Sequence, residues 1–210
     1  MSDDDNQVPS ALVAVGTKAL AVRSETLIKR GLALAKSLQP GDAAAHVTLG
    51  WALWRKGDWD GAIAEYREQI RLDPNDVMAH YDLGVALSQK GDRDGAIAEY
   101  RTAICLEPYY ADAHHSLGLA LAHKGDLDGA IAEYREALRL SPNNHIAHDD
   151  PFFDDFQKHD ALAHYNLAVA LERKQNFQEA LQEYRVAHEL DPQNPDYRTA
   201  YERLFQQVNK

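Results

Sequence analysis

The sequence predicts an all-α protein, a solenoid of stacked antiparallel helix pairs. A Leu-Gly pair recurs at a constant spacing of 34 residues, at Leu49-Gly50, Leu83-Gly84 and Leu117-Gly118. A fixed period of this length is typical of repeat architectures, in which each repeat buries its apolar face against its neighbours. Apolar residues within each copy also follow a helical period, and a turn motif separates two such segments. These observations together predict the fold class.

The first clear copy contains two amphipathic helices joined by a tight turn. Apolar residues of its first helix follow an i, i+4, i+7, i+8 pattern, at Ala45, Leu49, Ala52 and Leu53. The second helix has the corresponding stripe at Ala62, Ile63, Tyr66 and Ile70. Between them, Gly57 is expected to end the first helix in a left-handed conformation. Asp58 is then expected to cap the second helix, which predicts a helical hairpin.

The same pattern divides most of the chain into repeats. Clear copies span 43–76, 77–110, 111–144 and 161–194, and a degenerate copy spans 9–42. The last clear copy has Gln175-Asn176 in place of the Gly-Asp turn, and Ala168 in place of the helical glycine. Residues 195–210 carry apolar side chains at helical spacing, which predicts a C-terminal capping helix. The acidic residues 1–8 are expected to be disordered.

Several positions repeat together in the clear copies. They are the Leu-Gly pair, a small residue at Ala62, Ala96, Ala130 and Ala180, an aromatic residue at Tyr66, Tyr100, Tyr134 and Tyr184, and a closing proline at Pro74, Pro108, Pro142 and Pro192. On these residues the sequence resembles the tetratricopeptide repeat (TPR) family over about four-fifths of its length. The resemblance implies an alpha-alpha superhelix, whose first helices line a concave groove for a segment of a partner protein.

The inward positions of that groove can be carried over from the family residue by residue. They fall on Trp51, Trp54, Arg55, Tyr81, Val85, His115, Leu119, His123, Tyr165 and Arg173. Aromatic and aliphatic side chains with scattered polar groups are typical of a peptide-binding surface. The alternative for Trp51 and Trp54 is that they pack against the degenerate copy 9–42.

A TPR subclass, the co-chaperone domains, grips a C-terminal carboxylate with Lys, Asn and Arg at set inward positions. The corresponding positions in this sequence hold Val47, Trp51, Asp82, Asp112 and Ser116. The two aspartates would repel a carboxylate. The sequence therefore predicts a protein without this carboxylate clamp.

A sixteen-residue insertion, 145–160, separates the third and fourth clear copies. Its sequence is HIAHDDPFFDDFQKHD, which is acidic and contains Phe152, Phe153 and Phe156. One interpretation is that these rings fill the gap between the two repeats, and another is that they contact the groove or a partner. A third is an artefactual or disordered insert. If the rings dock on a second copy of the chain, the protein is a self-assembling homo-oligomer.

Composition and charge narrow the possible partners and compartment. The net charge of −11 and the pI near 5.3 argue against nucleic acid or an anionic membrane as a general partner. The single cysteine, Cys105, excludes an intrachain disulfide and a Cys-rich zinc site. We expect Cys105 on an exposed helix face, where a redox role is a less favoured interpretation than an incidental substitution. The acidic N-terminus, and an apolar run at 11–22 too short to span a bilayer, predict a cytoplasmic protein.

The sequence offers no constellation of catalytic residues and no cofactor motif. It contains no Gly-rich phosphate loop, nucleophile elbow or HExxH zinc motif. His46, His80, His114 and His164 recur once per repeat, so stacking is expected to separate them, and we interpret them as packing residues. His145, His148 and His159 form a looser cluster that is expected in a solvated loop, with adventitious binding of a divalent ion as the less favoured alternative. We therefore predict no metal site and a non-catalytic scaffold or adaptor that binds a protein or peptide, with homo-oligomerisation as the alternative.

Overall fold

The computed structural model describes residues 43–141 and 153–209 of the 210-residue chain. Within these ranges the secondary structure consists of nine α-helices and contains no β-strand. The all-α prediction is therefore confirmed. The chain divides into two compact units, unit 1 ending at Pro108 and unit 2 beginning at Tyr109. The degenerate copy predicted at 9–42 lies outside the described residues.

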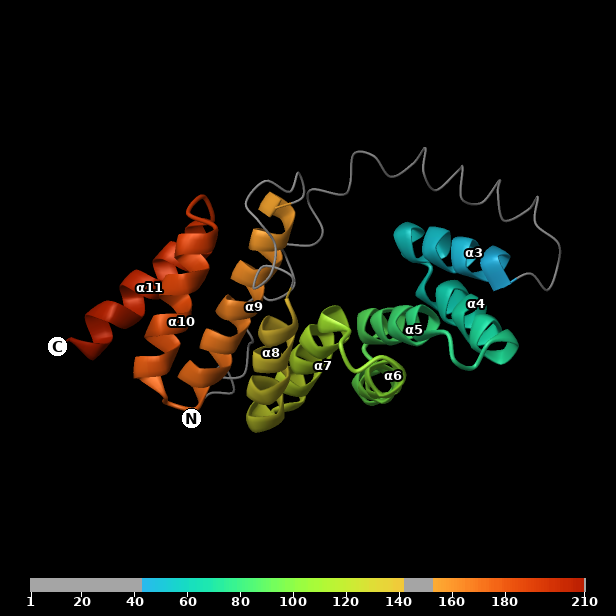
Figure 1. Ribbon diagram of the computed structural model, residues 1–210, viewed down its shortest axis with the longest axis horizontal. Coiled ribbons are helices and arrows are strands. Elements are labelled where there is room, and N and C mark those ends of the chain that lie inside the picture. The colour runs from blue at the N-terminus through green and yellow to red at the C-terminus, as the bar shows by residue number, and fades with distance from the viewer. Residues whose placement is uncertain (1–42, 142–152, 210) are drawn as a thin grey trace, which may run out of the picture. The chain divides into compact units, whose positions relative to one another are not determined.

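Unit 1 contains two helix pairs of uniform length. The helices are α3 (Ala43–Lys56), α4 (Trp59–Leu72), α5 (Val77–Lys90) and α6 (Arg93–Leu106), each of 14 residues. Helix α3 packs on α4, α4 on α5, and α5 on α6 (Figure 1). Because each connection is short, successive helices run in opposite directions.

Unit 2 has the same arrangement, with one longer helix. Its helices are α7 (Ala111–Lys124), α8 (Leu127–Leu140), α9 (Phe153–Arg173), α10 (Phe177–Leu190) and α11 (Pro195–Val208). Helices α7 and α8 pack together, α8 packs on α9, α9 on α10, and α10 on α11. Helix α9 has 21 residues, so its first turns extend beyond the 14-residue length of the other first helices.

The turn between the helices of each pair follows local chemistry. Gly57 has φ +83°, a left-handed conformation that only glycine adopts without a steric cost. The Asp58 carboxylate then accepts a hydrogen bond from the Gly61 amide at 3.0 Å, which caps α4. Both predicted roles are thus confirmed. Gln175 occupies the corresponding turn before α10 with φ 63°, so this turn keeps its geometry without glycine.

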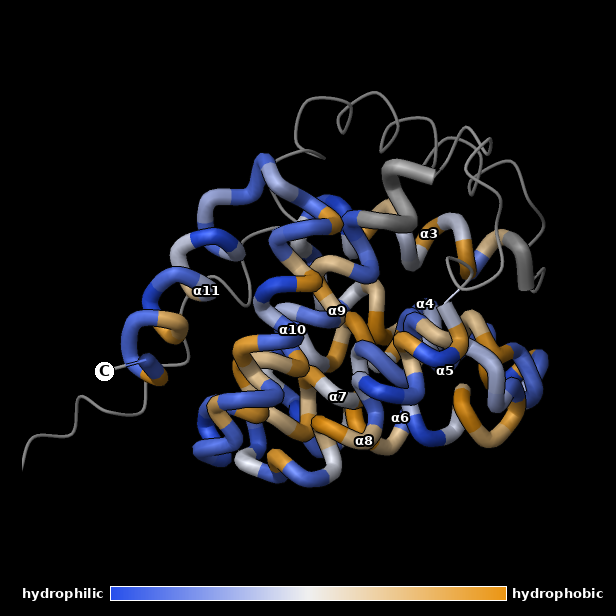
Figure 2. The backbone as a smooth tube through the Cα atoms, turned by 60° about the vertical axis from the view of Figure 1, so that its left-hand side comes forward, coloured by the Kyte–Doolittle hydropathy of each residue, from blue (hydrophilic) through white to orange (hydrophobic). Residues whose placement is uncertain are grey.

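The two helices of a pair interlock where a glycine faces a tyrosine ring. A Cβ atom on Gly84 would lie 2.6 Å from Cε1 of Tyr100, and Gly50 and Gly118 have the same relation to Tyr66 and Tyr134. These three tyrosines are buried, with at most 3% of their surface exposed. Hydrophobic and hydrophilic stretches alternate along the helices (Figure 2), as expected when one face of each helix is buried. The recurring glycine and tyrosine are therefore one steric unit.

The insertion does not interrupt the packing of the fourth clear copy on the third. In unit 1, Lys90 at the end of α5 forms an ion pair with Asp60 of α4. In unit 2, Lys174 forms the corresponding ion pair with Asp128 of α8, although the insertion lies between them in sequence. Both pairs join the same two repeat positions. The C-terminal part of α9 thus sits on α8 as α5 sits on α4. Phe152, and the side chains of Phe153 and Phe156, lie outside the described part of the chain.

Candidate partner-binding face

Helices α3 and α5 carry the candidate site of unit 1. Trp51 on α3 is 37% exposed, and the Arg55 guanidinium carbon lies 5.3 Å from the centre of its ring. This stacking holds the indole at the surface through a cation–π interaction. On α5, Tyr81 and Val85 are half-buried and share one face at i, i+4 spacing. The Tyr81 ring lies 5.9 Å from that of Tyr100, which anchors it to α6.

Trp54 differs from Trp51 because it packs within its own repeat. Its ring is half-buried and meets Trp59 of α4 edge-on, with 6.0 Å between ring centres. Its indole nitrogen is buried and, among the described residues, has no hydrogen-bond partner. Trp54 therefore packs α3 against α4. The alternative contact with 9–42 lies outside the described residues.

Asp82 is a half-buried carboxylate on the same face of α5. Burial, together with the nearby charge of Asp76, raises its pKa to about 6. Asp76 itself is engaged, because it accepts hydrogen bonds from the Ala79 amide and from Gln69 Nε2. Asp82 makes no hydrogen bond or ion pair within residues 43–141 and 153–209. By sequence it falls at an inward position of the groove and argues against a carboxylate clamp, and its burial is what makes it a candidate.

Tyr66 of α4 lies between α3 and the charge of Asp82 on α5. Tyr66 of α4 places its ring against Gly50, the residue that precedes Trp51 on α3. Burial raises the pKa of Tyr66, and the charge of Asp82 adds to that rise. Tyr66 therefore packs on α3 and is influenced by the carboxylate on α5. We call Trp51, Arg55, Tyr81, Asp82 and Val85 the unit 1 face.

In unit 2, the predicted groove residues of α7 make internal contacts. Nε2 of His115 lies 3.0 Å from Nδ2 of Asn166, and its ring centre lies 5.7 Å from that of Tyr134. Burial, with a smaller contribution from His159, lowers the pKa of His115 to about 4. The imidazole is therefore neutral at pH 7 and accepts the Asn166 hydrogen bond. Leu119 and His123 on the same helix are half-buried.

Tyr165 and Arg173 on α9 are also used for packing. Tyr165 is only 8% exposed, with its ring centre 5.5 Å from that of Tyr184 and 5.0 Å from that of Tyr197 on α11. Arg173 donates from a guanidinium nitrogen to the carbonyl of Ala122 at 3.1 Å, near the end of α7. These two residues hold helices together. We therefore leave them out of the candidate site.

A polar cluster that the sequence did not suggest joins α9, α10 and α11 in unit 2. Arg203 of α11 donates two hydrogen bonds to the Glu172 carboxylate, at 2.6 and 2.7 Å, and the Tyr184 hydroxyl donates a third at 2.9 Å. Burial acts to raise the pKa of Glu172, but the hydrogen bonds from Arg203 and Tyr184 outweigh it and leave this pKa lowered. Helix α11 is thus fixed to α9 and α10 by charge as well as by aromatic packing.

The four repeated histidines each pair with a glutamate of their own repeat. Nδ1 lies 2.6 to 2.7 Å from the glutamate Oε2 in His46–Glu65, His80–Glu99, His114–Glu133 and His164–Glu183. Each pair joins the first helix to the second, which agrees with a packing role. The sequence analysis did not pair these glutamates with the histidines. The constant separation of nineteen residues is the sequence feature that would have revealed the pairs.

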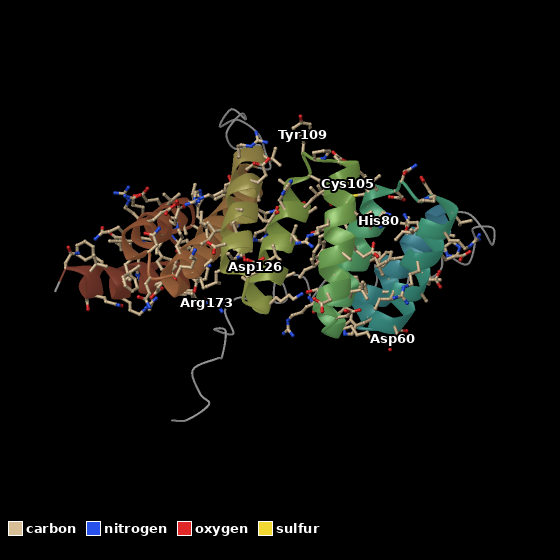
Figure 3. All side chains as sticks on the ribbon, turned by 90° about the horizontal axis from the view of Figure 1, so that it is seen from below. Asp60, His80, Cys105, Tyr109, Asp126 and Arg173 are labelled. Carbon is tan, nitrogen blue, oxygen red and sulfur yellow. The ribbon has the colours of Figure 1, made fainter. Side chains whose placement is uncertain are left out.

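Other site classes find no support in the described ranges. No group of three or more His, Cys, Asp or Glu side chains there could hold a metal ion, and His145 and His148 lie outside those ranges. Among the helices described, none combines the length and apolar character needed to cross a bilayer. Cys105 on α6 is exposed as expected, and Tyr109 is 74% exposed (Figure 3).

Comparison with known protein families identifies the family of this chain. Models of the tetratricopeptide repeat match residues 23–77, 47–108, 81–145 and 161–194, which together cover more than half of the chain. The chain belongs to the tetratricopeptide repeat family. Its matched segments include the Gly-Tyr contacts and capped turns described above.

Solved TPR structures share this fold. A crystal structure of MamA is 25% identical over 79% of this chain and 86% of its own, with a TM-score of 0.65. YrrB, described as a TPR protein with an unusual peptide-binding site, is 22% identical over 86% and 87%, with a TM-score of 0.66. PilF of Pseudomonas aeruginosa is 18% identical over 80% and 69%, with a TM-score of 0.65. No curated protein is significantly similar to this chain in sequence.

Proposed function

We propose that this TPR protein is a non-catalytic adaptor that binds a peptide or helix of a partner protein on the unit 1 face. Membership of the family supports the general role, because TPR proteins are protein-interaction scaffolds. The proposal is carried by the exposed Trp51 on α3 and by Asp82 on α5, a half-buried carboxylate that has no partner among the described residues. Large aromatic side chains of this kind dominate the binding energy of protein interfaces.

The choice of unit 1 rests on the difference between the two units. In unit 2 the predicted anchors are engaged internally, His115 by Asn166 and Tyr165 by two tyrosine rings. In unit 1 Trp51 keeps 37% of its surface exposed, and Met78 on α5 keeps 52%. A partner gains most where apolar surface still faces water. The same helices present Asp82, which disfavours an acidic partner and a carboxylate clamp.

Fluorescence anisotropy with labelled peptides tests the proposal. A pool of blocked nonapeptides, rich in Leu and Tyr and carrying basic or neutral polar residues, is titrated with the wild type and with Trp51→Ala. Because Trp51 is partly exposed, the variant is expected to stay folded and to bind at least about tenfold more weakly, which corresponds to about 1.4 kcal/mol.

Phe205→Ala is the matched control. Phe205 on α11 is also an exposed aromatic residue, with 47% of its surface accessible, but it belongs to unit 2. We expect this variant to bind the pool as the wild type does. Equal binding by Trp51→Ala and wild type would refute the unit 1 face, as would an equal loss in both variants.

Self-association is the alternative outcome, and its residues lie mostly outside the described side chains. Light scattering across protein concentrations, in reducing buffer, separates the two possibilities. A concentration-dependent mass that returns to monomer when 149–159 is deleted would favour assembly through the insertion.

A further inference from the structure

We propose that the unit 1 face selects a partner segment carrying a lysine or arginine side chain, whose cationic group pairs with Asp82. The inference rests on the proposed function, because it names the chemistry that the same face recognises. It goes beyond that function by assigning Asp82 as the residue that determines specificity.

The first argument is that Asp82 is an acceptor without a donor. A carboxylate removed from water loses hydration that only a hydrogen-bond donor or a cation can replace. Neither is supplied by the described residues, and the nearest charge contributing to its electrostatic environment is the like charge of Asp76. Asp76 is already occupied by Gln69 and Ala79. A partner's ammonium or guanidinium group would supply the missing donor.

The second argument is that the repeat does not require an acid at this position. The residues corresponding to Asp82 in the other clear copies are Thr48, Ser116 and Asn166, all uncharged. Asn166 shows what an amide does there, since it is 2% exposed and pairs with His115. The helix pair therefore forms without a charge at this position. The carboxylate of the second clear copy is particular to the unit 1 face.

The third argument concerns the surroundings of the carboxylate. The unit 1 face also contains Trp51 and the half-buried Tyr81 and Val85. Aromatic and aliphatic side chains of this kind suit the methylene stem of lysine or arginine, while the charged end reaches the carboxylate. Arg55 already stacks on Trp51, which demonstrates that this indole accepts a guanidinium group. Charge and apolar surface thus point to the same class of side chain.

The experiment uses three pools of blocked nonapeptides that differ only at the central residue, which is lysine, glutamine or glutamate. All flanking residues are uncharged, and terminal acetyl and amide groups remove the terminal charges. Each pool is titrated into the full chain at pH 7.5 and low salt, and binding is measured by fluorescence anisotropy. We expect the lysine pool to bind about tenfold more tightly than the glutamine pool, the ratio that one charge-assisted hydrogen bond typically supplies.

Asp82→Asn is the decisive variant, since asparagine keeps the shape and is found at the corresponding position 166. It is expected to abolish the preference for lysine, so that the lysine and glutamine pools bind this variant equally. Asp60→Asn, which removes an exposed carboxylate from α4, is expected to keep the preference.

The outcomes separate this inference from the proposed function. Equal binding of the lysine and glutamine pools, or a lysine preference that survives Asp82→Asn, overturns the role of Asp82 and leaves the adaptor proposal standing. A preference for the glutamate pool also overturns it. If none of the pools binds, the unit 1 face is not a peptide site and both proposals fail.

Discussion

Replacing Asp82 by asparagine is expected to stabilise unit 1 at neutral pH and to lose that effect in acid. The carboxylate is half-buried, lacks a partner among the described residues, and has a pKa raised to about 6 from its ordinary value of 3.8. An asparagine amide carries no charge to desolvate. The substitution should therefore remove a penalty that the wild type retains.

The size of the penalty follows from the two pKa values. A tenfold change in a protonation equilibrium corresponds to about 1.4 kcal/mol, so the rise at Asp82 gives an upper bound of about 3 kcal/mol. Because Asp82 keeps some contact with water, we expect about 1 to 2 kcal/mol. The folded-state pKa lies above the unfolded one, so ionisation destabilises the fold above pH 6. The penalty fades as the pH falls from 6 toward 4.

Urea unfolding followed by tryptophan fluorescence measures the stability of unit 1, which contains Asp82. All three tryptophans, Trp51, Trp54 and Trp59, lie in unit 1. At pH 7.5 the free energy of unfolding of Asp82→Asn should exceed that of the wild type, and at pH 4 the two should agree. Asp60→Asn is the matched control, because its exposed ion pair with Lys90 contributes less than about 1 kcal/mol.

Two results would refute the reasoning. A loss of stability in Asp82→Asn at pH 7.5 would mean that the carboxylate has a favourable partner in the folded protein. A gain of equal size at pH 7.5 and pH 4 would mean that the effect comes from packing rather than from charge.

Three further predictions follow from particular contacts. Gly84→Ala should destabilise unit 1 by about 1 to 3 kcal/mol in tryptophan-monitored urea unfolding, because its Cβ would press on Tyr100; a gain, as helix propensity alone predicts, would contradict the steric argument. His115 has a pKa lowered to about 4, so the neutral imidazole contributes its full share to the stability of unit 2 above pH 6.5. This contribution is lost as the pH falls toward 4. In urea unfolding followed by circular dichroism, the free energy of unfolding should fall by about 1 to 2 kcal/mol between pH 7 and pH 5. This fall should be absent in His115→Gln, which keeps a partner for Asn166. Gln175→Gly should raise the thermal midpoint by relieving left-handed strain of about 1 kcal/mol, and an unchanged midpoint would show that the turn is not strained.

Much of the fold could be predicted because its determinants are local. Gly57 and Asp58 define a turn through their own backbone and capping preferences, and these act over a few residues. The contact between Gly84 and Tyr100 is less local, yet it repeats with the period and is therefore visible as a pattern. The partner-binding residues were harder to predict, because the position of a residue on a helix face does not reveal whether a neighbouring helix covers it. Tyr165 is the example, covered by Tyr197 of α11.

The sequence by itself determined the helices, their turns and the repeat, since hydrogen bonding within a helix and the spacing of apolar residues depend on near neighbours. Only the tertiary structure decided how side chains from different helices pair. The His–Glu contacts span nineteen residues, and the insertion leaves the Lys174–Asp128 pair intact. The same holds for Asp82, whose charge is evident in the sequence. Its half-buried state, without a partner in the described part of the chain, depends on the helices that surround it, because desolvation is a property of packing rather than of residue type.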